Sequence, residues 1–304
     1  GQVYHTNENG VLENAQISGS YLGPLLVVAS YDKYSETVID GESIERETAL
    51  TCPLPNGCVN ENNEAVAFGD SFAPPASFKL MAVVHEVTDP LTINVSPLTH
   101  LAAKLAFGDF ISDGTSCDNS TCLADIFSKG LINAEKIYEA NSRLQKQALI
   151  NTGFPVNIAP WQSESITDTV IQQDAAKHGL LSNVFFQDMV TRGESTQQVL
   201  DWWVDSYLVN KGQLIEDDQA NAIKQLDFRH LFETAVAIEQ QFADVAEGSL
   251  SDSALQLAAT TYGNSLSSLD ADVVTTFSGD SLPLGEGEES IEAKITAAKT
   301  LVGN

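Results

Sequence analysis

Residues 91–103 read LTINVSPLTHLAA, and the predicted secondary structure of the chain changes within this stretch. Its first five residues are mostly β-branched, which favours a strand. Ser96 and Pro97 follow, and they suit the N-cap and the first position of a helix. The serine hydroxyl can accept an unpaired backbone N–H of the first turn, and proline has no N–H that would need a partner there. The stretch therefore predicts a strand that passes directly into a capped helix, at a joint between two domains.

The residues before this joint alternate short apolar runs with turn-forming residues, which is typical of antiparallel β-structure. The apolar runs predict strands at Ala15–Ser18, Leu25–Tyr31, Thr48–Thr51, Ala65–Phe68, Phe78–Val87 and Leu91–Val95. About six or seven short strands in this length are typical of two packed antiparallel sheets. We therefore predict an antiparallel β-sandwich over residues 1–95.

From Ser96 onward apolar residues recur at helical spacing, so residues 96–304 are predicted to form a mostly α-helical domain. Gly179 is a candidate break in one long segment, and Ser195 with Gln198 has the S-x-x-Q form of a capping box. The predicted helices are Leu98–Phe107, Asn133–Ile150, Ile166–Thr191, a helix from Ser195 through Tyr207, Asp217–Leu226, Phe228–Ala246, Ser251–Leu269 and Ile291–Leu301. The fold class predicted for the whole chain is α+β, in two parts.

The run NVSPLTHLA at residues 94–102 resembles the N-V-T/S-P-L-T-x-L-A segment of many bacterial surface and periplasmic proteins, often lipoproteins. Residues 10–17 (GVLENAQI) and 23–29 (GPLLVVA) are similar to the start of these proteins too. In that group a small β-sandwich of carboxypeptidase-regulatory-like or Ig-like type precedes a helical region. The resemblance covers the first third of the chain. It implies this architecture and a secreted, cell-surface or periplasmic location, and it assigns no catalytic residue.

The composition is strongly acidic, which excludes some classes of partner. The 304 residues include 42 acidic and 15 basic side chains, for a net charge of −27. Nucleic-acid binders need a basic surface, and docking on anionic membranes needs one as well. No apolar run approaches the length of about 18 residues that a membrane-spanning helix requires. The acidity favours solubility in a medium that screens self-repulsion, and binding of multivalent cations at clustered carboxylates is the alternative.

The four cysteines form two close pairs in the sequence, Cys52 with Cys58 and Cys117 with Cys122. The residues between the members of each pair are turn formers, so each pair can approach closely. Two local disulfides, and hence an oxidising compartment, are the favoured interpretation. A zinc site is the alternative, but the spacings differ from the usual C-x2-C and no histidine lies near either pair.

The loop around the second cysteine pair carries side chains that suit calcium. Asp109, Asp113, Asp118 and Asn119 offer oxygen ligands, and calcium takes six to eight oxygens. The spacing does not fit the D-x-D-x-D-G pattern of an EF-hand, because Asp109 and Asp113 are four residues apart. A solvated loop held by a disulfide is therefore the main interpretation, calcium is the alternative, and no other cofactor is expected.

The sequence shows no motif that predicts catalysis. The five histidines are isolated from one another, and no G-x-S-x-G, G-x-G-x-x-G or P-loop motif is present. Paired carboxylates are numerous only because the chain is acidic. Trp202 and Trp203 are the best candidates for an aromatic platform that binds a ligand such as a sugar. Adjacent helical residues point about 100° apart, however, so packing of one or both in the core is the stronger interpretation.

These observations favour a non-enzymatic structural or adhesive protein of the cell surface or the extracellular space. Its expected partners are copies of itself or other surface proteins, and filaments are one form such assembly could take. The polar segment Gly1–Gly10 could then add a strand to the exposed sheet edge of a neighbour. The first alternative is a module that binds a glycan or peptide between the two domains. The second is a hydrolase that uses two carboxylates.

Overall fold

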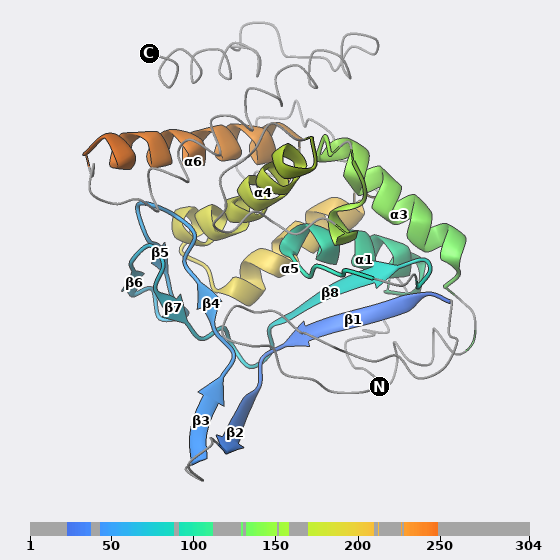
Figure 1. The fold of residues 1–304 in the computed structure, drawn as a ribbon, viewed down its shortest axis with the longest axis horizontal. Coiled ribbons are helices and arrows are strands. Elements are labelled where there is room, and N and C mark those ends of the chain that lie inside the picture. The colour runs from blue at the N-terminus through green and yellow to red at the C-terminus, as the bar shows by residue number, and fades with distance from the viewer. Residues whose placement is uncertain are drawn as a thin grey trace, which may run out of the picture.

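The computed structural model combines short strands and longer helices (Figure 1). In that view most of the helices lie in the upper part, the longest strands run below them near the middle, and the shorter strands lie to the left and lower left. The structure describes residues 23–37, 43–87, 91–111, 129, 132–150, 152–157, 170–209, 212, 226 and 228–248.

The strands form antiparallel pairs. The pairs are β1 (Leu25–Ser30) with β8 (Lys79–Val84), β2 (Lys33–Thr37) with β3 (Ser43–Glu47), β4 (Leu50–Thr51) with β7 (Ser71–Phe72) and β5 (Cys58–Val59) with β6 (Ala65–Val66). Each pair is a separate two-stranded sheet in the described part of the chain. The described strands do not form two facing sheets, so the predicted β-sandwich is not shown.

The helices follow the strands in the sequence. They are α1 (Pro97–Ile111), α3 (Ala134–Gln147), the short 3₁₀ helix η1 (Pro155–Asn157), α4 (Val170–Arg192), α5 (Thr196–Val209) and α6 (Phe228–Gly248). Figure 1 shows α1 beside β8, and α4 between α6 and α5. Antiparallel strand pairs followed by helices confirm the predicted α+β class.

The two helix caps predicted at Ser96 and Ser195 are confirmed in detail. The backbone N–H of Thr99 donates to Ser96 Oγ at 3.2 Å, and the N–H of Ser96 donates to Thr99 Oγ1 at 2.8 Å. At the start of α5 the N–H of Gln198 donates to Ser195 Oγ at 3.3 Å, and the N–H of Ser195 donates to Gln198 Oε1 at 2.9 Å. Each pair therefore satisfies two backbone donors reciprocally, as a capping box does.

The predicted strand at Leu91–Val95 is wrong, because residues 91–96 form neither strand nor helix. They run beside η1 instead, where the backbone N–H of Asn94 donates to the Val156 carbonyl at 2.8 Å. The side-chain amide of Asn157 donates to the Thr92 carbonyl at 3.1 Å. The η1 turn and the side-chain amide of Asn157 thus make the hydrogen bonds with this segment that a neighbouring strand would otherwise make.

The β2–β3 hairpin was not among the predicted strands. It projects away from the helices (Figure 1). Apolar and polar side chains do not alternate along its two strands, whose sequences are KYSET and SIERE. Polar contacts join the two strands, such as the 2.7 Å hydrogen bond from Ser35 Oγ to Glu45 Oε1. Such a hairpin buries little apolar surface, so the period-two pattern that marks a half-buried strand is missing.

The segment Ile166–Thr191, expected as one long helix or as two divided at Gly179, is one helix within the described residues, because α4 is continuous through Gly179. Residues on both sides of Gly179 are buried in the core, and this packing outweighs the modest cost of one glycine in a helix. Several predicted elements lie partly or wholly outside the described residues. They are Ala15–Ser18, Asp217–Leu226, Ser251–Leu269 and Ile291–Leu301.

The core joins the strands to the helices. Cys52, Leu54 and Phe72 lie in the same cluster of buried side chains as Leu180 and Trp203. Core residues from both sides of the predicted boundary at residue 95 therefore pack together. None of the helices in the described ranges has the length and apolar character needed to cross a membrane.

Candidate functional site

The β1–β8 sheet is asymmetric in its surroundings. The strands pair over their whole lengths, with Leu26 opposite Val83 and Val28 opposite Met81. Every residue of β8 after Lys79 is buried, whereas β1 becomes exposed from Val28 onward. Figure 1 shows α1 on the side of β8 away from β1. The two edges of this sheet therefore meet different environments.

Side chains from α1 and α3 occupy the outer edge of β8. The backbone N–H of Met81 donates to His100 Nδ1 at 3.0 Å, and the Thr99 hydroxyl donates to the Met81 carbonyl at 3.2 Å. The amide of Asn141 donates to the Val83 carbonyl at 3.0 Å. All three helical side chains are buried. These contacts occupy the N–H and C=O of Met81 and the C=O of Val83, so a further strand cannot pair with β8 at these groups.

The contact with Met81 fixes the protonation state of His100. Its Nδ1 atom accepts a hydrogen bond and therefore carries no proton, so the neutral ring is the Nε2–H tautomer. Burial, with a smaller contribution from the charge of Lys104, lowers the pKa of His100 to about 3. The ring thus remains neutral at physiological pH and acts as a permanent acceptor for the strand.

The occupied edge of β8 determines which groups of β1 face outward. In an antiparallel pair, two facing residues either hydrogen-bond to each other or both direct their N–H and C=O groups away from the partner strand. Met81 and Val83 bond to the helices, so Val28 and Leu26 must direct their own N–H and C=O away from β8. Nothing in the described part of the chain pairs with these two residues at the outer edge.

The composition of β1 is unusual for an edge strand. Its sequence is LLVVAS, with no charged residue and no proline. The side chain of Val28 is 41% exposed. Edge strands commonly carry charges or proline, which discourage pairing with another chain. The β2–β3 hairpin follows that rule, since it carries Lys33, Glu36, Glu45, Arg46 and Glu47.

A serine and a histidine approach each other beside this sheet. Ser96 Oγ lies 2.9 Å from His178 Nε2, a distance typical of a nucleophile and its general base. The two residues are 4% and 0% exposed, however, and Ser96 Oγ also accepts the N–H of Thr99. The contact therefore links the start of α1 to the middle of α4, and the pair has no surface that a substrate could reach.

A buried carboxylate organises the contact between α4, α5 and α6. Asp188 Oδ2 accepts the indole N–H of Trp203 at 2.8 Å, and Asp188 Oδ1 lies 2.8 Å from His230 Nε2. Trp203 is fully buried. The structure thus places this tryptophan in the core, where its polar atom and its ring are both engaged, and it cannot contribute to a surface platform.

Trp202 is half-buried and also has occupied faces. The guanidinium of Arg192 lies 4.2 Å from the centroid of its ring, and the ring of His230 packs edge-on at 5.7 Å. Arg192 donates two hydrogen bonds to the carboxylate of Glu194. The adjacent tryptophans are therefore not brought together as a ligand-binding surface.

Glu239 is a buried acid that the sequence did not single out. It is 1% exposed on α6, and neither carboxylate oxygen has a hydrogen-bond partner in the described structure. Burial, with a smaller contribution from Asp244, raises the pKa of Glu239 to about 7. The sequence gave no indication that Glu239 is buried, because a glutamate on a helix is ordinarily solvated.

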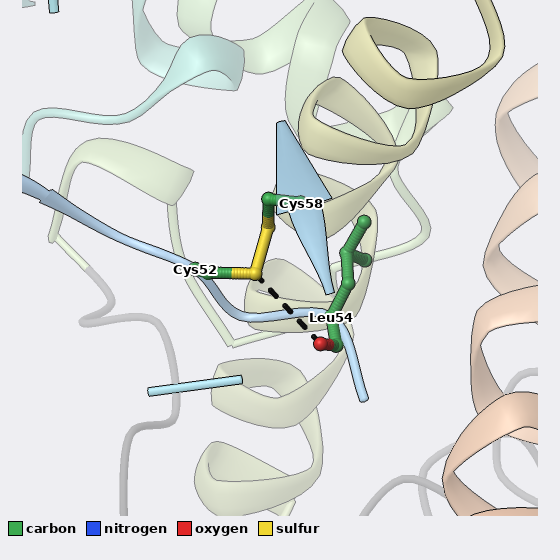
Figure 2. The surroundings of a disulfide bond; sticks show 3 residues. All are labelled: Cys52, Leu54 and Cys58. Carbon is green, nitrogen blue, oxygen red and sulfur yellow. Dashed lines mark hydrogen bonds between the residues drawn. A yellow bond between two sulfur atoms is a disulfide. The ribbon is translucent and has the colours of Figure 1, made fainter. Parts of the chain in front are cut away.

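The first predicted disulfide is confirmed (Figure 2). Cys52 and Cys58 are bonded, with their Cα atoms 5.7 Å apart. Cys52 Sγ also lies 3.8 Å from the Leu54 carbonyl oxygen, so the bridge closes over the turn that it spans. Both cysteines belong to the core cluster. The second pair, Cys117 and Cys122, lies outside the described residues.

The proposed calcium ligands are not brought together in the described residues. Asp109 belongs to α1, which continues to Ile111, so it lies on a helix and not in the predicted loop. Asp113, Asp118 and Asn119 lie outside the described residues. Among the residues that are described, no group of three or more His, Cys, Asp or Glu side chains is placed to hold a metal ion.

Comparisons with known proteins give no relative. No protein-family model, no curated protein and no solved structure matches the chain.

Proposed function

We propose that this chain is a non-enzymatic structural or adhesive protein of the cell surface, the periplasm or the extracellular space, and that it works by associating with copies of itself. The observation that carries the proposal is the unequal β1–β8 sheet. One edge is occupied by His100, Thr99 and Asn141, while at the other edge no described residue pairs with the outward backbone groups of an uncharged strand. An open edge of this kind is a surface for pairing with another chain.

The disulfide supports the location in this proposal. Cys52 and Cys58 form a bridge, and such bridges persist in oxidising compartments. Their burial inside the main core makes the bridge part of the folded structure. The disulfide therefore supports a protein that acts outside the cytosol.

The positions of the reactive side chains support a structural role. Ser96, His178 and Asp188 are almost fully buried, and each bonds to an element of the fold. These polar contacts join α1 to α4 and α4 to α5 and α6. The alternative of a ligand site between two domains gains no support, since side chains of both parts pack in one cluster there.

The test is the assembly state of the intact protein. Light scattering during gel filtration, over a wide range of concentration, gives the mass of the species in solution. We expect a mass that is a multiple of 32.6 kDa. Negative-stain microscopy then shows whether the assemblies are closed particles or filaments. A mass of 32.6 kDa at every concentration would overturn the proposal.

A further inference from the structure

We infer that two copies of the chain associate through their β1 strands, which pair antiparallel about a two-fold axis at Val27. The two β1–β8 sheets then become one continuous sheet. This inference rests on the proposed function and identifies the surface that carries it. Figure 1 shows β1 on the side of β8 away from α1, so the strand is positioned to meet a second copy.

The hydrogen-bonding groups of β1 are complementary to themselves. Leu26 and Val28 direct their N–H and C=O groups outward, as deduced from the bonds of Val83 and Met81 to the helices. When two such strands run antiparallel, Leu26 of one copy can face Val28 of the other. Each of these pairs then exchanges both of its hydrogen bonds. The same contacts occur twice, as the two-fold symmetry of an isologous dimer requires.

Both ends of β1 limit the register. Towards its end the carbonyl of Ser30 already faces the Thr48 hydroxyl at 3.5 Å. At its start Pro24 has no backbone N–H to donate. Within the described ranges, Leu26 and Val28 are therefore the outward residues of β1 with both groups available. Centring the contact on them places Val27 opposite its own copy, as a pair without direct hydrogen bonds.

Charge favours β1 over the β2–β3 hairpin for this contact. In a two-fold interface each surface meets an identical one, so charged residues near the axis face like charges. The chain carries a net charge of −27, yet β1 has no charged residue. The β2–β3 hairpin carries charges on both strands. The other uncharged strands in the described residues, β4 to β7, have two residues each, so β1 with six residues is the longest uncharged strand that could meet a second copy of itself.

The first experiment removes one outward N–H. Val28→Pro deletes a donor that points away from β8, so pairing within the protomer keeps its hydrogen bonds. Val28→Thr is the matched control, because it keeps the N–H and the β-branched shape. In gel filtration with light scattering, we expect the Pro variant at 32.6 kDa and the Thr variant at twice that mass, at the same concentration. Unfolding curves in urea verify that both variants are folded.

The second experiment tests the register. In pairs without direct hydrogen bonds the Cα atoms of facing residues are about 4.5 Å apart, which allows a disulfide. Val27 faces itself in the inferred dimer, whereas Val28 faces Leu26. Mild oxidation should therefore link Val27→Cys into a covalent dimer at least ten times faster than Val28→Cys. The unsubstituted protein, oxidised in parallel, measures any linkage through the native cysteines.

The outcomes separate this inference from the function it rests on. Assemblies that persist unchanged in Val28→Pro would overturn the β1 contact and leave self-association standing. Loss of assembly on deletion of Gly1–Gly10, with Val28→Pro still assembled, would assign the contact to the N-terminal segment and overturn the inference. Equal linkage of the two cysteine variants would overturn the register. A single mass of 32.6 kDa for the unsubstituted protein would overturn both the inference and the proposed function.

Discussion

His100 Nδ1 accepts the backbone N–H of Met81 across 3.0 Å, so a helical side chain takes the place that a neighbouring strand would have. The ring is 3% exposed, and water cannot replace it. This contact has two effects. It gives a hydrogen-bond partner to the buried N–H of Met81, and it prevents another strand from pairing with β8 at this group, which leaves β1 as the edge for further pairing.

Replacing His100 with leucine should leave the Met81 N–H buried and unpaired. An unsatisfied buried donor costs about 1–3 kcal/mol, so we expect His100→Leu to lower the free energy of unfolding by that amount. His100→Asn has the same shape as leucine and keeps an acceptor near the Nδ1 position. We expect it to lose less stability in urea denaturation. Equal losses in the two variants would contradict a role for the hydrogen bond.

The same histidine predicts a dependence of stability on pH. The pKa of His100 in the folded chain is lowered from 6.5 to about 3. At pH values between these two, the unfolded chain therefore binds a proton that the folded chain does not bind. The contribution to stability is complete above about pH 6.5. It decreases as the pH falls below that value, by at most about 1.4 kcal/mol per pH unit. Urea unfolding from about pH 7 to pH 5 should show the decline in the unsubstituted protein. His100→Asn should decline less, and parallel curves would refute the assignment.

The helix starts were predictable because their signals are local. Ser96 with Thr99, and Ser195 with Gln198, satisfy backbone groups within four residues, and short-range geometry determines these bonds. The strand pairing of Leu91–Val95 was not predictable in this way. β-branched residues show that a segment is extended, but its partner depends on the rest of the fold. The partner here is Val156, more than sixty residues away.

The polar contacts in the interior could not be predicted for the same reason. Ser96 and His178 are 82 positions apart, and Asp188 meets His230 across 42 positions. Each histidine is isolated in the sequence, where a solvated side chain is the usual interpretation. Cys52 and Cys58 differ, because only five turn-forming residues separate them, and a turn over so short a segment brings the two cysteines together.

The two adjacent tryptophans provide a matched test of the Asp188 contact. Trp203 donates its indole N–H to a buried carboxylate, whereas the N–H of Trp202 has no partner in the described structure. Trp203→Phe should therefore lower the free energy of unfolding by about 2–4 kcal/mol, since it leaves the buried carboxyl group of Asp188 with one donor fewer and creates a cavity. Trp202→Phe removes the same ring atoms from a half-buried site and should cost clearly less. A larger loss at Trp202, measured by urea denaturation, would contradict this account.

The Cys52–Cys58 bridge should contribute a modest amount to stability. It closes a small loop, and the entropy of such a loop in the unfolded chain corresponds to about 2 kcal/mol. The double substitution of both cysteines by alanine should lower the free energy of unfolding by about that amount. Reductant should have little effect on the folded protein, since both sulfur-bearing residues are buried. Rapid thiol labelling of the native protein after mild reduction would contradict the burial of this bridge.

Glu239 should make the protein less stable as the pH rises. Its pKa is raised from 4.5 to about 7, so the folded chain holds a proton that the unfolded chain releases between these values. The stabilising contribution is complete below about pH 4.5 and is lost as the pH rises through about 7, by at most about 1.4 kcal/mol per pH unit. Glu239→Gln keeps the shape without the charge. It should be more stable than the unsubstituted protein at pH 8, and this advantage should vanish near pH 5.

The control for Glu239 is an exposed glutamate. Glu139 lies on the solvent side of α3, so Glu139→Gln makes the same change in net charge without relieving a buried carboxylate. Unfolding in urea at several pH values should show a pH-dependent gain for Glu239→Gln and a flat difference for Glu139→Gln. If the two variants gained equally at high pH, the gain would come from the lower net charge of a very acidic chain. A gain confined to Glu239→Gln instead locates it in the unpaired carboxylate on the core face of α6, where desolvation is the dominant cause.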